Sequence, residues 1–174
     1  TPFVTTPCSA PAAPASDCIS TTSGTAPQMF VRPAALQASA DSPIALVTDS
    51  TASLTPEDRE RLDISVVNLY VILNGEQRPE NEIDDYAAFY KAVLESPQLT
   101  TTSQPSIGDF MEVYGPLLDA GKEIVSLHLS GAISGTCEAA RQAAAQLEAD
   151  GRGGERITVV DSRTTAGGLA LVSL

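Results

Sequence analysis

Residues 123–149, EIVSLHLSGAISGTCEAARQAAAQLEA, decide the fold class, because a core strand, a polar loop and a helix follow one another directly. Glu123–Leu129 combines apolar and β-favouring residues, which is typical of a strand inside a sheet. Thr136–Ala149 is rich in Ala, which favours a helix. A strand that leads through a short loop into a helix predicts one unit of an α/β fold.

The same alternation continues on both sides of this unit. Ile44–Val47 and Ile157–Val160 are short apolar runs that predict two more core strands. Four more helices are predicted. The first begins at the Thr55-Pro56 cap, the second spans 84–95, the third runs from the capping box at Ser106 to about 120, and the fourth begins at 165. Strands alternating with helices require right-handed crossovers. We therefore expect an α/β fold with a mainly parallel sheet flanked by helices.

Two further patterns refine this expectation. Ile64–Leu73 is β-rich and meets Asn74-Gly75, the strongest short hairpin-turn signal. The helix over 84–95 has an apolar side, as expected of a helix that packs on a core, formed by Tyr86, Ala87, Tyr90, Val93 and Leu94.

Residues 1–43 differ in composition from the rest of the chain. They hold seven of the 12 prolines and only three charged residues. A segment dominated by Ala, Thr, Pro and Ser buries too little apolar surface to offset its ordering entropy. We expect a disordered leader over 1–43 and a folded lobe over 44–174. Because the chain begins with Thr, we also expect a fragment or a processed product.

Charge and cysteine content exclude several function classes. The chain has 10 Lys and Arg against 22 Asp and Glu, a net charge of −12, which repels nucleic acid and allows only transient contact with anionic membranes. The chain has three cysteines, and only Cys137 lies in the expected fold. Such a set cannot form a disulfide framework, so we expect a reducing, cytoplasmic setting. His128 is the only histidine and has no ligand cluster near it in sequence, so we expect no metal site.

Polar loops follow the predicted strands, at the edge where parallel sheets bind ligands. They span Thr48–Leu54, Leu129–Thr136 and Asp161–Gly168, and the hydroxyl-rich loop 100–106 precedes a helix. In Leu129–Thr136 the glycines allow close approach of the backbone, and the helix start suits an anion. Ser134 adds a hydroxyl donor; the alternative that Ser134 only caps the helix stays open.

Catalysis by this loop is not favoured. Gly131-Ala132-Ile133-Ser134-Gly135 lacks the G-x-S-x-G spacing of a hydrolase, and His128 in the preceding strand gives no triad order with Ser134. The Gly-Lys-Ser/Thr ending of a P-loop is also missing. We therefore predict no catalytic residue and no cofactor; a phosphate- or nucleotide-handling α/β enzyme domain stays the alternative.

Four stretches of the chain resemble the DegV family of bacterial fatty-acid-binding proteins. They occur in the family's order, at Val47–Leu54, Thr102–Ser106, Ser134–Thr136 and Val160–Ser162. The resemblance implies two-lobed α/β proteins that hold one fatty acid between the lobes, so we expect this chain to be the N-terminal lobe, with the second lobe missing.

The resemblance also implies a ligand, a site and a partner. The ligand is a long-chain fatty acid such as palmitate, and the implied lipid-binding residues are Thr102, Ser103, Ser134 and Gly135. Members of the family are the acyl-carrying subunit of fatty acid kinase and present the carboxylate to a separate catalytic subunit for acyl-phosphate formation. The implied function is therefore lipid binding without catalysis.

Overall fold

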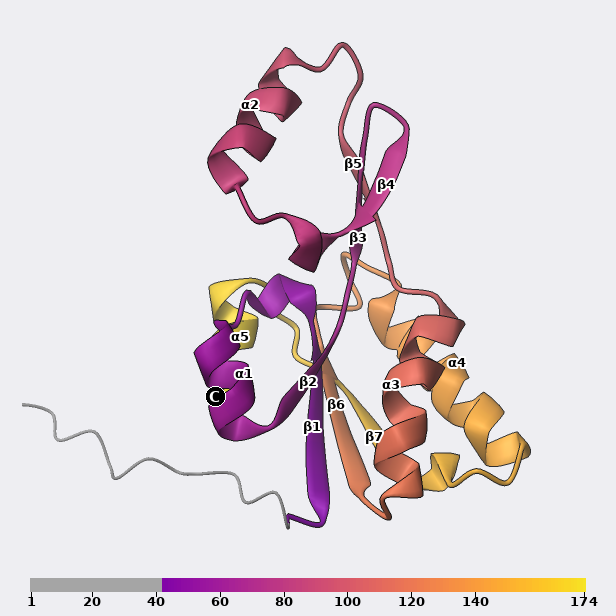
Figure 1. Cartoon of the computed structure of the whole chain (residues 1–174). Helices are drawn as coiled ribbons and strands as arrows, with labels where there is room; N and C mark the ends of the chain where they lie inside the picture. The colour runs from indigo at the N-terminus through magenta and orange to yellow at the C-terminus, as the bar shows by residue number, and fades with distance from the viewer. Residues whose placement is uncertain (1–41) are drawn as a thin grey trace, which may run out of the picture. The chain divides into compact units, whose positions relative to one another are not determined.

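The computed structural model describes residues 42–174, which are built around a four-stranded parallel sheet (Figure 1). The strand order is β2-β1-β6-β7, and all pairs are parallel. The strands are β1 (Ile44–Asp49), β2 (Ile64–Val67), β6 (Glu123–His128) and β7 (Ile157–Asp161). The mainly parallel sheet is thus confirmed. The expected leader over 1–43 lies, except for its last two residues, outside the described residues.

Helices cover both faces of this sheet (Figure 1). One face carries α3 (Ile107–Asp119) and α4 (Thr136–Ala149), and the other carries α1 (Pro56–Leu62) and α5 (Gly167–Ser173). The capping box at Ser106 and the Thr55 cap with Pro56 are formed as predicted. The main core lies between the sheet and the α3–α4 layer and includes Val47, Phe110, Tyr114, Ile124 and Leu147.

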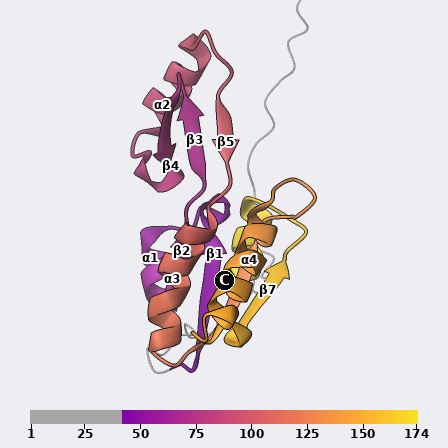
Figure 2. The same cartoon turned by 90° about the vertical axis from the view of Figure 1, so that its right-hand side faces the viewer.

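A second, antiparallel sheet in the order β4-β3-β5 follows β2 along the chain. Its strands are β3 (Tyr70–Leu73), β4 (Glu76–Pro79) and β5 (Thr101–Ser103). Asn74 and Gly75 have φ values of 53° and 83°, which makes the predicted tight hairpin turn. The β-rich stretch at 64–73 is therefore two strands in two sheets. Figures 1 and 2 both show the small sheet beyond the carboxyl ends of β1 and β6.

The apolar side of α2 (Tyr86–Glu95) does not pack on a core. Tyr86 is 51% exposed, Tyr90 60% and Leu94 87%, so the packing expected from the helical pattern is wrong among the described residues. The partly buried residues of α2 are Phe89, Ala92 and Val93, so the covered side of the helix shares only Val93 with the predicted apolar side. The pattern identified the helix correctly but not the surface that its apolar side meets.

Short 3-10 helices complete the described part: η1 (Ser50–Ala52), η2 (Glu80–Glu82) and η3 (Gly154–Arg156). Among residues 42–174, no helix has the length and apolar character needed to cross a bilayer. The loops that matter below begin where β1 and β6 end, at η1 and at Leu129.

Candidate functional site

A cavity of about 430 Å³ lies at the carboxyl ends of β1 and β6, next to the small sheet. Polar and apolar side chains line it together: Thr51, Leu69, Tyr70, Val71, Glu80, Thr102, Gln104, Leu129, Ile133, Ser134 and Gly135. Its position follows the rule for parallel sheets, and its size lies in the usual range of small-molecule sites, about 300–1,000 Å³. The cavity brings together loops that are far apart in the sequence.

Three of the four sequence-predicted site residues line this cavity, namely Thr102, Ser134 and Gly135. Ser103, the fourth, does not belong to the lining. The difference follows from strand geometry, because successive residues of β5 point to opposite faces. The role of Ser103 in lipid binding therefore stays a prediction.

The loop 129–136 and the loop before α3 are in close contact at Gly135. A methyl group added at Gly135 would overlap the side-chain amide of Gln104. Glycine at this position thus lets the two loops approach, which holds Ser134 and Thr102 on one cavity. The sequence predicted that the glycines of this loop let the backbone approach a ligand, whereas the group found close to Gly135 is the Gln104 side chain.

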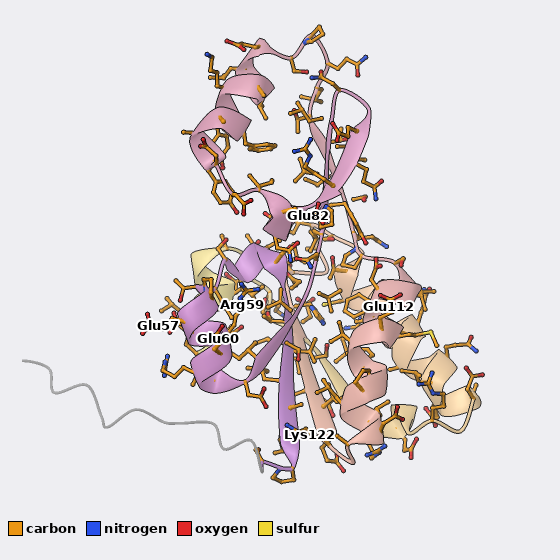
Figure 3. All side chains as sticks on the ribbon, viewed as in Figure 1. Glu57, Arg59, Glu60, Glu82, Glu112 and Lys122 are labelled. Atoms are coloured by element: carbon orange, nitrogen blue, oxygen red, sulfur yellow. The ribbon has the colours of Figure 1, made fainter. Side chains whose placement is uncertain are left out.

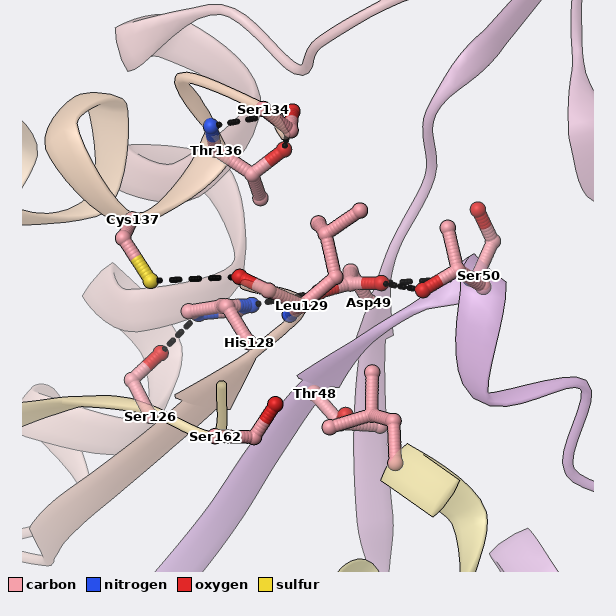
Figure 4. Close-up of polar contacts among 12 residues, drawn as sticks. Thr48, Asp49, Ser50, Ser126, His128, Leu129, Ser134, Thr136, Cys137 and Ser162 are labelled. Atoms are coloured by element: carbon pink, nitrogen blue, oxygen red, sulfur yellow. Dashed lines mark hydrogen bonds and ion pairs between the residues drawn. The ribbon is translucent and has the colours of Figure 1, made fainter. Parts of the chain in front are cut away.

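The Ser134 hydroxyl is bound at the start of α4 without being its cap (Figure 4). Gly135 is the N-cap residue and provides no side-chain bond. Ser134 Oγ accepts a hydrogen bond from the Thr136 N–H at 3.3 Å and lies 2.8 Å from Thr136 Oγ1. The alternative left open from the sequence is therefore partly right, since Ser134 does bind a backbone N–H of the first turn.

Asp49 joins the two loops that follow β1 and β6 (Figure 4). Its carboxylate is fully buried and accepts bonds from the Thr51 hydroxyl at 2.6 Å and the Thr51 N–H at 3.2 Å. It also accepts a bond from the Leu129 N–H at 2.9 Å. Because Thr51 and Leu129 both line the cavity, Asp49 fixes the spacing of its walls.

A second anchor holds the same loop from β7. The backbone N–H groups of Arg163 and Gly131 bind the Asp161 carboxylate and hold the pKa of that carboxyl below its usual range. A methyl group at Gly131 would lie 3.0 Å from an Asp161 oxygen, so the close approach favours glycine. The loop 129–136 is thus attached to β1 through Asp49 and to β7 through Asp161.

The sequence reasoning missed a buried polar chain that begins at Asp49. His128 Nδ1 donates to Asp49 Oδ2 at 3.1 Å, and His128 Nε2 lies 2.6 Å from Ser126 Oγ. Ser126 Oγ lies 2.6 Å from the hydroxyl of Tyr114, whose pKa is raised by burial. Ser126 and His128 are two residues apart on β6, and this period-two spacing was the available signal.

The Asp49–His128–Ser126 order matches that of a hydrolase triad, but the serine cannot act on a substrate. Ser126 and His128 are both fully buried, and Ser126 Oγ is bound to Tyr114 in the core. A nucleophile must reach a substrate carbonyl. These residues form a hydrogen-bonded network inside the core. Ser134, which does line the cavity, is bound to Thr136 and not to His128.

Glu80 is the one charged residue among the described lining residues, and its carboxylate accepts a bond from the Ser50 hydroxyl at 2.6 Å. Figure 3 labels acids and bases on other elements, such as Glu57 and Arg59 on α1 and Glu82 on η2, none of which lines this cavity. No group of three or more His, Cys, Asp or Glu among residues 42–174 could hold a metal ion.

Glu80, Leu69 and Val71 are lining residues that the sequence did not indicate. They belong to the hairpin segment, whose place beside the parallel sheet is set by tertiary contacts. Glu80 also borders a second cavity of about 370 Å³ that contains Arg59 and Asn68 but none of the sequence-predicted site residues.

A family model described as "Uncharacterised protein, DegV family" matches residues 43–174. A DegV domain-containing protein of Streptococcus pneumoniae is 38% identical over 122 residues, which cover 70% of this chain and 42% of the relative. One from Listeria monocytogenes is 41% identical over 128 residues, which cover 73% and 43%. The chain thus spans less than half the length of these curated relatives.

Solved structures show the same likeness. A fatty-acid-binding DegV family protein from Thermus thermophilus has a TM-score of 0.67 and 38% identity, over 75% of this chain and 44% of that one. DegV of Bacillus subtilis, also described as a fatty-acid-binding protein, has a TM-score of 0.65 and 34% identity, over 75% and 45%.

Proposed function

Because the chain belongs to the DegV family, we propose that it binds the head group of a long-chain fatty acid, such as palmitate, in the cavity lined by Thr102 and Ser134. The observation that carries the proposal is the convergence of these two hydroxyls, 32 residues apart in sequence, on a cavity whose other walls include Leu69, Val71 and Leu129. Hydroxyl donors suit the carboxylate, and the apolar walls suit the first methylenes of the tail.

The head group is held without an ion pair in this proposal. Ser134 and Thr102 supply hydroxyl donors beside the start of α4, and Glu80 repels an anion that approaches its side of the cavity. The carboxylate oxygens then stay nucleophilic and accessible. We therefore propose that the protein presents the carboxylate to a fatty acid kinase catalytic subunit, which forms the acyl phosphate, and is itself no enzyme.

The chain covers only part of each relative, so the tail-binding part of the site concerns the whole protein. More than half of each relative lies outside the match, and we propose that this part forms a second lobe that covers the tail. We place the protein in the cytoplasm, with only transient membrane contact, in accord with the net charge of −12.

The first prediction is that fatty acid co-purifies with the protein. We expect about one fatty acid per protein in a chimera of the Thermus thermophilus relative in which residues 43–174 replace the matching segment. Organic extraction of the chimera expressed in bacteria, followed by mass spectrometry, measures the ratio. An empty chimera, or one that carries only nucleotide or phosphate, would contradict the proposed function.

The second prediction concerns the two hydroxyls. Thr102→Ala and Ser134→Ala should each weaken fatty-acid binding by about 1–2 kcal/mol, a value between the net contribution of an ordinary hydrogen bond and that of a bond to a charged group. Titration of the chimera with a fluorescent fatty acid measures the change. Ser103→Ala is the matched comparison, because Ser103 neighbours Thr102 but does not line the cavity, and we expect a smaller effect. Unchanged affinity in both Thr102→Ala and Ser134→Ala would remove these hydroxyls from the site.

A further inference from the structure

Ser134 and Thr136 make two hydrogen bonds to each other, and their protons can be assigned from burial. Thr136 is fully buried, and Ser134 Oγ, at 2.8 Å, is the only hydrogen-bond partner of its hydroxyl among the described residues. Leaving a buried hydroxyl proton without an acceptor costs about 1–3 kcal/mol. Ser134 is only partly buried and lines the cavity. The Thr136 hydroxyl therefore donates to Ser134.

This assignment fixes the Ser134 hydroxyl. A hydroxyl oxygen has two acceptor sites and one proton. The Ser134 oxygen accepts the Thr136 O–H at 2.8 Å and, at the longer distance of 3.3 Å, the Thr136 N–H. The Ser134 proton therefore points away from Thr136 and is left for a ligand in the cavity that Ser134 lines.

We propose that Thr136 is a positioning residue for the carboxylate: because its hydroxyl and N–H both donate to Ser134 Oγ, the Ser134 proton is turned away from Thr136 and towards the cavity. The inference rests on the proposed function and deepens it. An ionised carboxylate offers only acceptors, so a hydroxyl reduced to a donor matches it.

Another hydroxyl of the cavity wall, that of Thr51, has the opposite character. The Thr51 proton is donated to the Asp49 carboxylate at 2.6 Å, and Asp49 can accept but not donate. Thr51 therefore offers lone pairs, which favour a carboxylate at Ser134 over one at Thr51. The hydrogen-bond polarity of the walls thus determines where the carboxylate is held.

The third prediction tests this with Thr136→Val, which keeps the side-chain shape and removes the hydroxyl. Without that donor the Ser134 hydroxyl is held only by the longer bond from the Thr136 N–H and can rotate to other staggered positions, so fatty-acid affinity should fall about three- to tenfold. Thr136→Ser keeps the donor and should bind like the parent. Thr158→Val, an exposed change of the same kind on β7, is the control. Affinity is titrated in the chimera with a fluorescent fatty acid, and melting curves report folding.

Epistasis separates positioning from a general packing role. In a Ser134→Ala background, Thr136→Val should change affinity by less than about twofold, because the hydroxyl that it orients is gone. Equal losses in both backgrounds would overturn the inference, as would Thr136→Ser binding as weakly as Thr136→Val. Parent-like affinity of a folded Thr136→Val together with weak binding by Ser134→Ala would overturn it and leave the proposed function intact. Failure of the parent chimera to bind fatty acid would overturn both.

Discussion

Replacing Asp49 with Ala should lower the free energy of unfolding by about 3–5 kcal/mol, because each buried donor left without an acceptor costs about 1–3 kcal/mol. Asp49 is fully buried and accepts four hydrogen bonds, two from Thr51 and one each from Leu129 and His128. Alanine leaves these donors without an acceptor inside the protein. Urea denaturation of the 174-residue chain, followed by circular dichroism, measures the loss.

Two further variants serve as controls for Asp49→Ala. Asp49→Asn has nearly the same shape and keeps one oxygen acceptor, so we expect a smaller loss than for alanine. Asp119→Ala removes an exposed carboxylate from the end of α3 and should change stability by less than about 0.5 kcal/mol. A loss in Asp49→Ala as small as that in Asp119→Ala would show that the buried network contributes little to stability.

The direction of the network follows from its buried members. Tyr114 is fully buried, and its raised pKa keeps it protonated, so it donates to Ser126. Ser126 then donates to His128 Nε2, and His128 Nδ1 donates to Asp49. Every proton in this order has an acceptor. The residues that resemble a catalytic triad therefore stabilise the carboxyl ends of β1 and β6, where the loops of the site begin.

Local signals predicted much of the fold. The bounds of α4 agree with the sequence pattern at both ends, and the Ser106 capping box and the Asn74-Gly75 turn formed as expected. These features depend on neighbouring residues, because helix propensity, caps and tight turns act over a few positions. The polar loops at the carboxyl ends of β1 and β6 were found for the same reason, since strand direction follows from α/β alternation.

What the sequence did not predict depends on contacts between distant segments. Asp49 and His128 are 79 residues apart, and their contact requires β1 to lie beside β6, which no local pattern states. The apolar side of α2 has a helical period whether or not a partner surface exists, so its exposure was missed. Thr102 and Ser134 were identified through family resemblance, whereas Glu80 reached the cavity through the packing of the hairpin segment.

The largest difference in ligand affinity that we expect is the difference between the 174-residue chain and the chimera. The chimera should bind a long-chain fatty acid at least about a hundredfold more tightly. Each buried methylene contributes about 0.8 kcal/mol, so four additional covered methylenes give about 3 kcal/mol, which is more than a hundredfold. Ile133, an apolar wall of the cavity, is 66% exposed in the 174-residue chain, so that wall covers a tail only in part.

Acyl-chain length separates the contributions of the two parts of the proposed site. In the chimera, affinity should rise steadily from octanoate to palmitate, whereas in the 174-residue chain it should level off once the tail extends past Leu129 and Ile133. Titration of both proteins with the same series of fatty acids, after gel filtration to select monomers, measures the two slopes. Equal affinities and equal slopes would mean that the described lobe alone encloses the tail, and the proposal that a second lobe covers it would then be wrong. A steep slope in the chimera alone would assign the head group to the lobe described here and most of the tail to the part of the relatives that this chain does not match.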